Sequence, residues 1–393
     1  MDMLLSAILA ASLILQNPED TGPYTVSQQD VTHGDAYYGR GTVSGRIYYP
    51  NSSNNQPFPL VAFMHGWIEP ASDYDDLCQH IASWGYVVYS NDTETSFFAT
   101  LQAEAADTRA ALQWVEDESQ NPNSWLYEMT ANQPWAAIGH SMGGAAVASL
   151  ARLDSRVQYA VMLAPYKGSL LGNTDGAFYW FNRFEGSALV IGADEDLTNS
   201  WSSQVRPWYN TSTSSSRKLW ALIDGGDHFG CTDPDIQGLW GNGSLSGPEQ
   251  HKAYRKLVTA FLLAEVANEE NKYANFFETN NATTEGSSIN TPLWSTHDIN
   301  NNTINLGTFS KPQNVIRLAI SPDIGSQQTN FGELFLDLTT LRVISRSLAP
   351  LEGLVTYSLP VRASWSGANL YFQALATSSG SGSLSALSII SLP

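Results

Sequence analysis

Short apolar runs alternate with amphipathic stretches over the first two thirds of the chain. Each apolar run has four to six residues and ends in a polar or glycine-containing turn, which is typical of strands buried on both faces. The predicted strands are residues 60–64, 86–90, 135–138, 159–163, 188–191 and 218–223. The predicted helices are residues 73–83, 101–118, 144–150, 200–209 and 249–265. This alternation predicts an α/β fold with a doubly wound, mostly parallel sheet.

The ends of the chain depart from this alternation. Two strand-like stretches at 24–32 and 42–49 precede it, and we expect them to be antiparallel. Residues 278–291 are polar, which predicts a linker, and residues 292–393 hold short alternating runs without a helical period. We therefore expect an α/β domain over 24–277 and a small C-terminal β domain. Binding to a surface, binding to a partner and simple stabilisation all stay open as roles for that β domain.

The segment around Ser141 carries the strongest chemical signal. The motif Gly-His-Ser-Met-Gly at 139–143 follows a predicted strand and precedes a helix of small residues. A sharp turn at this place strains the serine backbone and exposes its hydroxyl, and the flanking glycines relieve the clash. We interpret Ser141 as a nucleophile; the alternative is a serine that only caps the helix.

A nucleophilic serine needs a base, and the base needs an acid that orients it. Of the seven histidines, His228 fits best, because it lies in a glycine-containing turn after the last predicted strand. The chain order serine, acid, histidine is typical of this fold class. The other histidines lie in the serine motif, in an earlier motif, in helical patterns or in polar turns: His140, His65, His80, His251, His33 and His297.

The loop at 192–197 supplies the candidate acids, because it follows the strand that precedes the histidine strand. It contains Asp194, Glu195 and Asp196. Asp194 and Asp196 fall on the same side of an extended chain, whereas we expect Glu195 to face solvent. Spacing alone leaves both aspartates open.

Acyl transfer also needs two amides that hold the negative oxygen of the tetrahedral intermediate. The amide of Met142 follows the nucleophile directly and is the first candidate. The second should come from the loop after an early strand, here His65-Gly66-Trp67, and we assign it to Trp67. The Trp67 indole can also form an apolar wall at the mouth of the site, or cover the sheet edge.

The charge balance excludes some partners. The chain has 38 acidic and 19 basic residues, a net charge of −19 and a pI of about 4.6. Such a surface repels nucleic acid and anionic membranes, and it suits an exported protein that is kept soluble by carboxylates. The 393 residues are compatible with two domains.

Residues 3–15 form an apolar run that is too short to span a bilayer. We interpret residues 1–17 as a signal peptide, although Asp2 stands where a positive charge is usual, so we expect an extracellular or periplasmic protein without stable membrane insertion. A buried N-terminal helix is the alternative.

The chain has two cysteines, Cys78 and Cys231. A disulfide that restrains the histidine loop and a pair of buried thiols both stay open. The spacing of the cysteines and histidines matches no zinc motif, so we expect no metal and no cofactor.

Four stretches together resemble one known family. They are the helix-to-strand segment at 80–88, the serine motif at 139–144, the acid loop at 191–196 and the histidine motif at 227–229. The chain resembles the bacterial cutinase-like polyesterases, which include poly(ethylene terephthalate) hydrolases and have the α/β-hydrolase fold. The resemblance covers roughly residues 24–277. In that family the last aspartate of the acid loop belongs to the triad, so the resemblance implies Asp196.

Three features depart from the family pattern. His65-Gly66-Trp67 replaces Pro-Gly-Tyr or Pro-Gly-Phe, and Tyr166 follows Pro165 where a tryptophan is common. The segment 168–183 is a long, aromatic-rich loop. A small-molecule carboxylesterase, a lipase and a chlorophyllase-like esterase therefore stay open as alternatives.

We predict a secreted, monomeric serine esterase that acts on a small or polymeric ester. Its triad would be Ser141, Asp196 and His228, and Trp67, Tyr166 and Phe229 would line an apolar groove. Two less favoured hypotheses are a non-catalytic binding protein on a hydrolase scaffold and an amidase or peptidase.

Overall fold

The computed structural model of the chain describes residues 17–52, 57–168, 170–172, 174–212, 215 and 217–267. In the C-terminal part it describes residues 282–286, 293–298, 303–309, 315–329, 332–348, 354–378, 381–384 and 388–392. The predicted signal peptide lies outside these residues except for Asn17.

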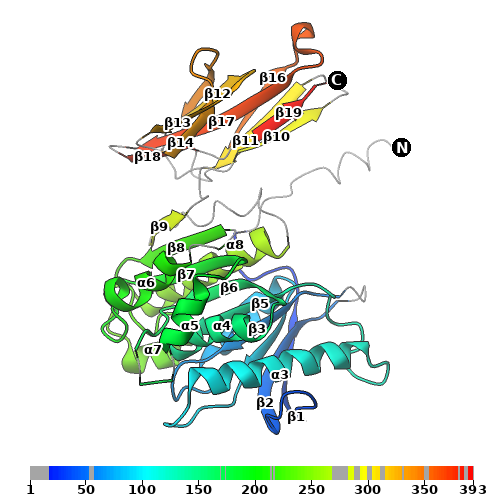
Figure 1. Cartoon of the computed structure of the whole chain (residues 1–393), viewed down its shortest axis with the longest axis vertical. Coiled ribbons are helices and arrows are strands. Elements are labelled where there is room, and N and C mark those ends of the chain that lie inside the picture. The colour runs from blue at the N-terminus through cyan, green and yellow to red at the C-terminus, as the bar shows by residue number, and fades with distance from the viewer. Residues whose placement is uncertain are drawn as a thin grey trace.

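A nine-stranded sheet forms the centre of the larger part of the molecule. Its strands are β1 (Val26–Gly34), β2 (Thr42–Pro50), β3 (Leu60–Met64), β4 (Val87–Asn91), β5 (Trp135–His140), β6 (Val157–Leu163), β7 (Ser187–Ala193), β8 (Arg217–Ile223) and β9 (Ala282–Gly286). Their spatial order is β1-β2-β4-β3-β5-β6-β7-β8-β9. The strands from β4 to β8 in this order are parallel, whereas β1, β2 and β9 pair antiparallel at the two edges (Figure 1). The predicted α/β-hydrolase fold is confirmed.

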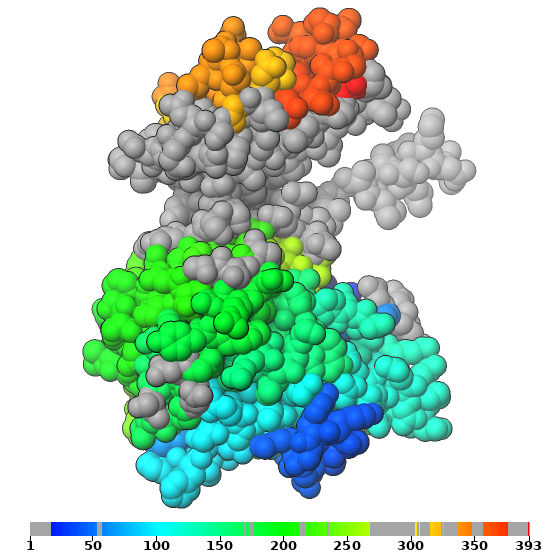
Figure 2. All heavy atoms as spheres, viewed as in Figure 1, coloured from blue at the N-terminus to red at the C-terminus, as the bar shows by residue number. Residues whose placement is uncertain are grey.

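Helices cover both faces of this sheet. The chain forms η1 (Ala71–Tyr74), α2 (Asp75–Ser83), α3 (Leu101–Gln120), α4 (Met142–Leu153), α5 (Thr174–Phe181), the π-helical turn η2 (Trp201–Val205), α6 (Arg206–Thr211), α7 (Pro234–Trp240) and α8 (Gly247–Glu265). Successive residues of β3 face the two layers of helices on either side of the sheet. Ala62 packs in the core with α3 to α6, and Phe63 packs with α2 and α8. The described residues of this part form one continuous body in the space-filling view (Figure 2).

In the part of the molecule around the central sheet, two α-helices and one strand were not predicted. Helix α5 lies in the segment expected to be a loop, and its Phe181 is fully buried against Phe184 and Trp208. Tertiary burial of these rings stabilises a helix that is too short to be stable alone. Helix α7 begins at Pro234, where a fixed φ suits a first helical turn.

Strand β9 corrects the linker prediction. Residues 282–286 lie inside the segment 278–291, and all five pair antiparallel with β8. The segment is polar, yet its adjacent threonines are β-branched and fit an edge strand. This part of the predicted linker is therefore a strand of the central sheet.

The C-terminal residues form smaller sheets, as expected for a β domain. One contains β10 (Leu293–Asp298), β11 (Thr303–Phe309) and β16 (Leu354–Pro360); another contains β12 (Val315–Ser321), β15 (Arg342–Leu348), β17 (Asn369–Ser378), β18 (Ser381–Leu384) and β19 (Ser388–Ser391); and β13 (Ile324–Thr329) pairs with β14 (Gly332–Leu336). A short turn of 3-10 helix, η4 (Ala363–Trp365), precedes β17. Leu306 of β11 and Leu318 of β12 belong to one buried cluster, so the first two sheets share a core.

No helix in the described part of the chain has the length and apolarity needed to cross a bilayer.

Candidate active site

The candidate catalytic residues lie at one edge of the sheet, because each follows the carboxyl end of a parallel strand. Ser141 follows β5, Asp196 follows β7, and His228 follows β8. Trp67 lies in the loop after β3 at the same edge. Residues that are far apart in the sequence can therefore meet here.

Ser141 has the strained backbone that the motif predicts. Its φ is 52° and its ψ is −111°, a conformation that side chains larger than hydrogen rarely adopt. A Cβ at Gly139 would lie 2.2 Å from the Gly143 carbonyl oxygen, and a Cβ at Gly143 would lie 2.2 Å from the Met64 carbonyl oxygen. Both glycines are therefore required by close backbone approach.

The structure brings Ser141, His228 and Asp196 together in one hydrogen-bonded chain. His228 Nε2 lies 3.1 Å from Ser141 Oγ, and His228 Nδ1 lies 2.8 Å from Asp196 Oδ2. All three residues are less than a tenth exposed. Because the carboxylate accepts a hydrogen bond from Nδ1–H, Nε2 is left free to accept the serine proton.

Backbone amides orient Asp196 within its loop. Its Oδ1 accepts hydrogen bonds from the amides of Thr198 at 2.8 Å and Asn199 at 2.7 Å, which leaves Oδ2 directed at the histidine. Asp194 instead accepts the Gly225 amide at 2.6 Å. Glu195 is partly exposed at the surface, where its carboxylate accepts hydrogen bonds from the amide and the hydroxyl of Ser244.

The loop that carries His228 is held by Asp227. One carboxylate oxygen accepts the Phe229 amide at 2.9 Å, and the other accepts the amides of Asn242 and Gly243. Gln250 of α8 also donates to Asp227, at 3.2 Å. These bonds fix the backbone on both sides of the imidazole.

The two candidate oxyanion donors lie at the turn and in the facing loop. Met142 is the first residue of α4, and the amides of a first helical turn have no acceptor inside the helix. The Trp67 amide likewise makes no hydrogen bond to another described residue. The Gly143 amide donates to the His65 carbonyl oxygen at 3.0 Å, which ties this loop to the start of α4.

His65 lies buried beneath the same loop as a cation. Its ring nitrogens lie 2.7 Å from the Gly66 carbonyl oxygen and 2.6 Å from the Thr93 carbonyl oxygen, so both must donate. Burial lowers the pKa of His65, but the neighbouring Glu104 carboxyl and the two carbonyls raise it above its ordinary value. Glu104 is fully buried 3.8 Å away, and burial raises its pKa to about 8.

The three residues predicted to line a groove lie in loops at the same edge of the sheet as Ser141. Trp67 is half-buried, its indole donates to the Phe97 carbonyl oxygen at 3.1 Å, and the two rings lie 4.9 Å apart. The Tyr166 amide donates to the Ser141 carbonyl oxygen at 2.9 Å. The Phe229 ring lies 5.2 Å from that of His228.

Comparison with known proteins identifies a family for this chain. The family described as PETase, PET hydrolase-like, matches residues 13–238, which include all three residues of the hydrogen-bonded chain. The chain belongs to the PET hydrolase-like family.

Individual relatives support the assignment at modest identity. Cutinase 1 of Thermobifida cellulosilytica is 29% identical over 225 residues, which cover 56% of this chain and 79% of that protein. A cutinase of Thermobifida fusca (strain YX) is also 29% identical over 225 residues, with 56% and 69% covered. A bis(hydroxyethyl) terephthalate hydrolase of Streptomyces coelicolor is 27% identical over 208 residues, with 53% and 61% covered. As a member of this family, the chain is a carboxylic ester hydrolase.

The sequence did not predict one contact in this PET hydrolase-like site. The Asn199 side-chain amide donates to the Ala164 carbonyl oxygen at 2.8 Å and lies 3.4 Å from Ser141 Oγ. Asn199 is 1% exposed, so its amide is held in place. The only sequence signal was its position three residues after Asp196, which does not indicate the direction of a side chain.

Both cysteines lie in the described part of the chain, and both are free buried thiols. Burial raises the pKa of each thiol, which disfavours the reactive thiolate. The disulfide alternative is therefore wrong. No group of side chains suited to a metal occurs among the described residues.

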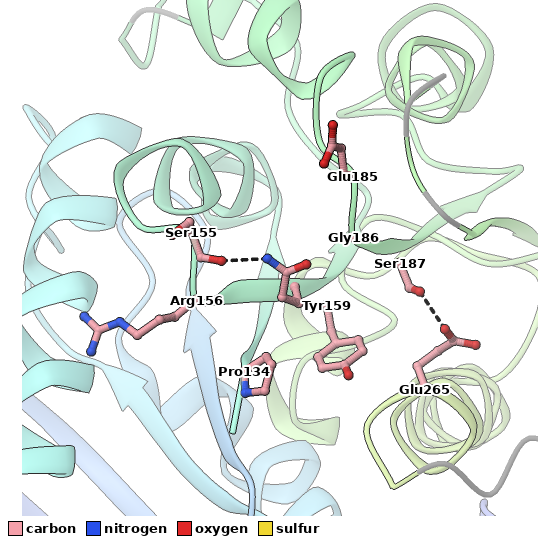
Figure 3. Close-up of a pocket in the computed structure, with 9 residues that line it drawn as sticks. Pro134, Ser155, Arg156, Tyr159, Glu185, Gly186, Ser187 and Glu265 are labelled. Atoms are coloured by element: carbon pink, nitrogen blue, oxygen red, sulfur yellow. Dashed lines mark hydrogen bonds between the residues drawn. The ribbon is translucent and has the colours of Figure 1, made fainter. Parts of the chain in front are cut away.

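A separate cavity of about 700 Å³ lies at the opposite ends of the strands (Figure 3). Its lining includes Arg156 before β6 and Ser187 at the start of β7. Ser187 donates to Glu265 at 2.6 Å, and Glu265 also pairs with Arg217 at 2.7 Å. Glu265 is thus paired at this cavity, which lies at the end of the sheet opposite to Ser141.

Proposed function

We propose that the chain is an exported serine esterase that hydrolyses carboxylic esters, including polyesters, through an acyl-enzyme on Ser141. The observation that carries this proposal is the unbroken chain of hydrogen bonds from Ser141 through His228 to Asp196. The spacing of 3.1 Å between Ser141 Oγ and His228 Nε2 allows the serine proton to pass to the imidazole without rearrangement, and the bond to Asp196 holds the imidazole in place.

In the first half-reaction, the Ser141 proton passes to His228 Nε2 while Oγ attacks the ester carbonyl carbon. The amides of Met142 and Trp67 hold the negative oxygen, and removal of one such donor typically costs about 3 kcal/mol in transition-state stabilisation. His228 then gives its proton to the leaving alcohol, and the acyl group stays on Oγ. Asp196 stabilises the imidazolium that forms.

In the second half-reaction, water attacks the acyl-enzyme and gives a proton to His228. The acid leaves as Ser141 Oγ regains that proton. The Asn199 amide, 3.4 Å from Oγ, is suited to donate to this oxygen as negative charge returns to it. No metal or cofactor is part of this proposal.

Exposed aromatic residues next to the oxyanion loop support a polymeric substrate. Phe97 is 66% exposed and Phe98 is 88% exposed, and their rings are 5.7 Å apart. Phe97 also contacts Trp67, so apolar surface extends from the site outward. Export is supported by the apolar run at 3–15 and by the strongly acidic composition.

The decisive experiment compares the wild-type enzyme with Ser141→Ala on nitrophenyl esters of rising chain length and on a polyester film. We expect the substitution to lower turnover of both substrates by roughly 10⁶-fold, as in other serine hydrolases, and to abolish labelling by a fluorophosphonate. Undiminished turnover by Ser141→Ala would overturn the proposal. A sharp fall of wild-type turnover beyond short chains, with no product from the film, would favour a small-molecule esterase.

A further inference from the structure

The hydroxyl of Tyr74 lies at a junction of buried hydrogen bonds behind the triad. It accepts the Gly66 amide at 3.0 Å and lies 2.6 Å from His140 Nδ1, and it donates to the Glu69 carboxylate. A phenol offers one donor and two acceptor positions, and all three are used here. Tyr74 is fully buried, so water cannot replace any of these partners.

His140 continues this network to the catalytic histidine. Its Nε2 lies 2.9 Å from the main-chain carbonyl oxygen of His228, so Nε2 must carry a proton. Its Nδ1 faces the Tyr74 oxygen and, at 3.3 Å, the Glu69 carboxylate. Because Tyr74 directs its own proton to Glu69, Nδ1 must donate as well, and His140 is an imidazolium.

The groups around His140 favour this charge. Burial lowers the pKa of His140, but the Cys231 thiol and the Glu69 carboxylate raise it well above its ordinary value. Burial raises the pKa of Glu69, yet its contacts with His140 and Tyr74 leave it below the ordinary value. The His228 ring lies 4.7 Å from that of His140, so Glu69 also offsets a positive charge next to the base.

We propose that Glu69, Tyr74 and His140 form a positioning cluster. This cluster fixes the relative positions of the oxyanion loop, the nucleophile turn and the histidine loop. Tyr74 restrains the oxyanion loop through Gly66, and His140 joins the nucleophile turn to the histidine loop through the His228 carbonyl. A Cβ at residue 66 would lie 2.0 Å from the Glu69 carboxylate, so the glycine leaves room for this cluster. The inference rests on the proposed roles of Ser141, His228 and the Trp67 amide.

The cluster matters because the reaction rate is sensitive to the relative positions of the catalytic groups. Misplacement of a catalytic group by about 1 Å can lower the rate about 10²-fold. Each loop is fixed locally, but their relative positions depend on contacts between segments 66 to 88 residues apart. The cluster is the place where all three segments meet.

The first test is Tyr74→Phe, which removes the hydroxyl and keeps the ring against Phe63. We expect kcat for a soluble nitrophenyl ester to fall about 10²-fold with KM changed less than about threefold. The matched control is Tyr89→Phe, because Tyr89 is equally buried and its hydroxyl lies 3.4 Å from His33, which is not in the site. Equal kcat values for wild type and Tyr74→Phe would overturn the inference.

The second test is Glu69→Gln, which removes the counter-ion of His140 and keeps the side-chain shape. We expect the alkaline limb of the kcat profile to move to lower pH, because His140 then loses its proton more readily. Glu69, Tyr74, Cys231 and His228 are the titratable groups that face His140. A purely structural role predicts a lower melting temperature with an unshifted profile, and that result would also overturn the inference.

Ser141→Ala separates failure of this inference from failure of the proposed function. If Ser141→Ala is inactive while both cluster variants keep the wild-type kcat and pH profile, only the inference fails. If Ser141→Ala stays active, the proposed function itself fails. Should Tyr74→Phe not fold, the pH profile of Glu69→Gln decides the question alone.

Discussion

Asp196 illustrates how backbone amides select one acid from three neighbouring carboxylates. The amides of Thr198 and Asn199 occupy its Oδ1 and leave Oδ2 for His228. Asp194 lies two residues earlier but is directed at the Gly225 amide. The turn at the end of β7 therefore decides which carboxylate contacts His228.

This geometry predicts different effects for two matched substitutions. Asp196→Asn should lower kcat about 10⁴-fold, because an amide cannot hold the required tautomer of His228. Asp194→Asn should change kcat less than about tenfold, because its main-chain partner is outside the proposed triad. Steady-state turnover of a nitrophenyl ester by both purified variants checks this, with melting temperatures as the control for folding. A larger loss in Asp194→Asn would contradict the assignment.

The packing of α2 against α8 buries two histidines without charge. His80 and His251 are 5% and 3% exposed, and His80 Nε2 donates to the Pro18 carbonyl oxygen at 2.8 Å. Burial and the nearby Arg255 lower the pKa of His80 to about 4 and that of His251 to about 3. Both residues are thus packing residues of this helix pair.

These lowered pKa values predict acid sensitivity. In the unfolded chain a histidine has a pKa of about 6.5, so below pH 6.5 the unfolded chain binds protons that the folded chain does not. The contribution of the two neutral histidines to the free energy of unfolding is therefore complete above pH 6.5 and is lost as the pH falls toward 4. At pH 5 each histidine should lower the free energy of unfolding by about 2 kcal/mol relative to pH 7.5. His251→Phe should remove the part that is due to His251, which is roughly half of the combined loss from the two histidines.

Urea unfolding at pH 7.5 and pH 5 measures the effect directly. At pH 7.5 both histidines are neutral, so the variant should match the wild type there and serves as its own control. The same loss of stability in both proteins between the two pH values would show that His251 is not responsible.

The central sheet of the whole molecule ends in a strand that belongs to neither predicted domain. Strand β9 covers the edge of β8, and an uncovered edge strand presents unpaired backbone groups to other chains. We propose that the ester hydrolase unit extends to Gly286 and that the β domain after it is dispensable for turnover of soluble esters.

Two truncated chains test this division. A chain that ends at residue 286 should hydrolyse a soluble ester within about twofold of the full chain, because the proposed catalytic groups lie on other loops. A chain that ends at residue 281 lacks β9 and should melt at a temperature lower by roughly 3 °C, as expected for a loss of about 1 kcal/mol. Calorimetry and turnover of both proteins provide the measurements. Equal melting temperatures, or a large loss of turnover in the longer chain, would contradict the division.

Much of this architecture follows from local patterns. The buried strands from β3 to β8 were predicted within three residues at each end, because continuous apolar runs of this length are compatible with a two-sided sheet. The glycines around Ser141 and the order of the parallel strands in the chain also predicted that Ser141, an acid of the loop at 192–197 and His228 would meet, and the family resemblance selected Asp196. The backbone chemistry of a sharp turn is local, so the sequence is sufficient for it.

Only the tertiary structure decided the features that depend on contacts between distant segments. Helix α5 forms because its aromatic rings are buried against α6, and β9 forms because the edge of β8 is available. The free state of both thiols, the Asn199 contact and the Tyr74 junction depend on the directions of side chains brought together by the fold. The sequence by itself determined the class of fold and its candidate chemistry, whereas long-range packing decided how that chemistry is held, because local periodicity does not encode the position of distant partners.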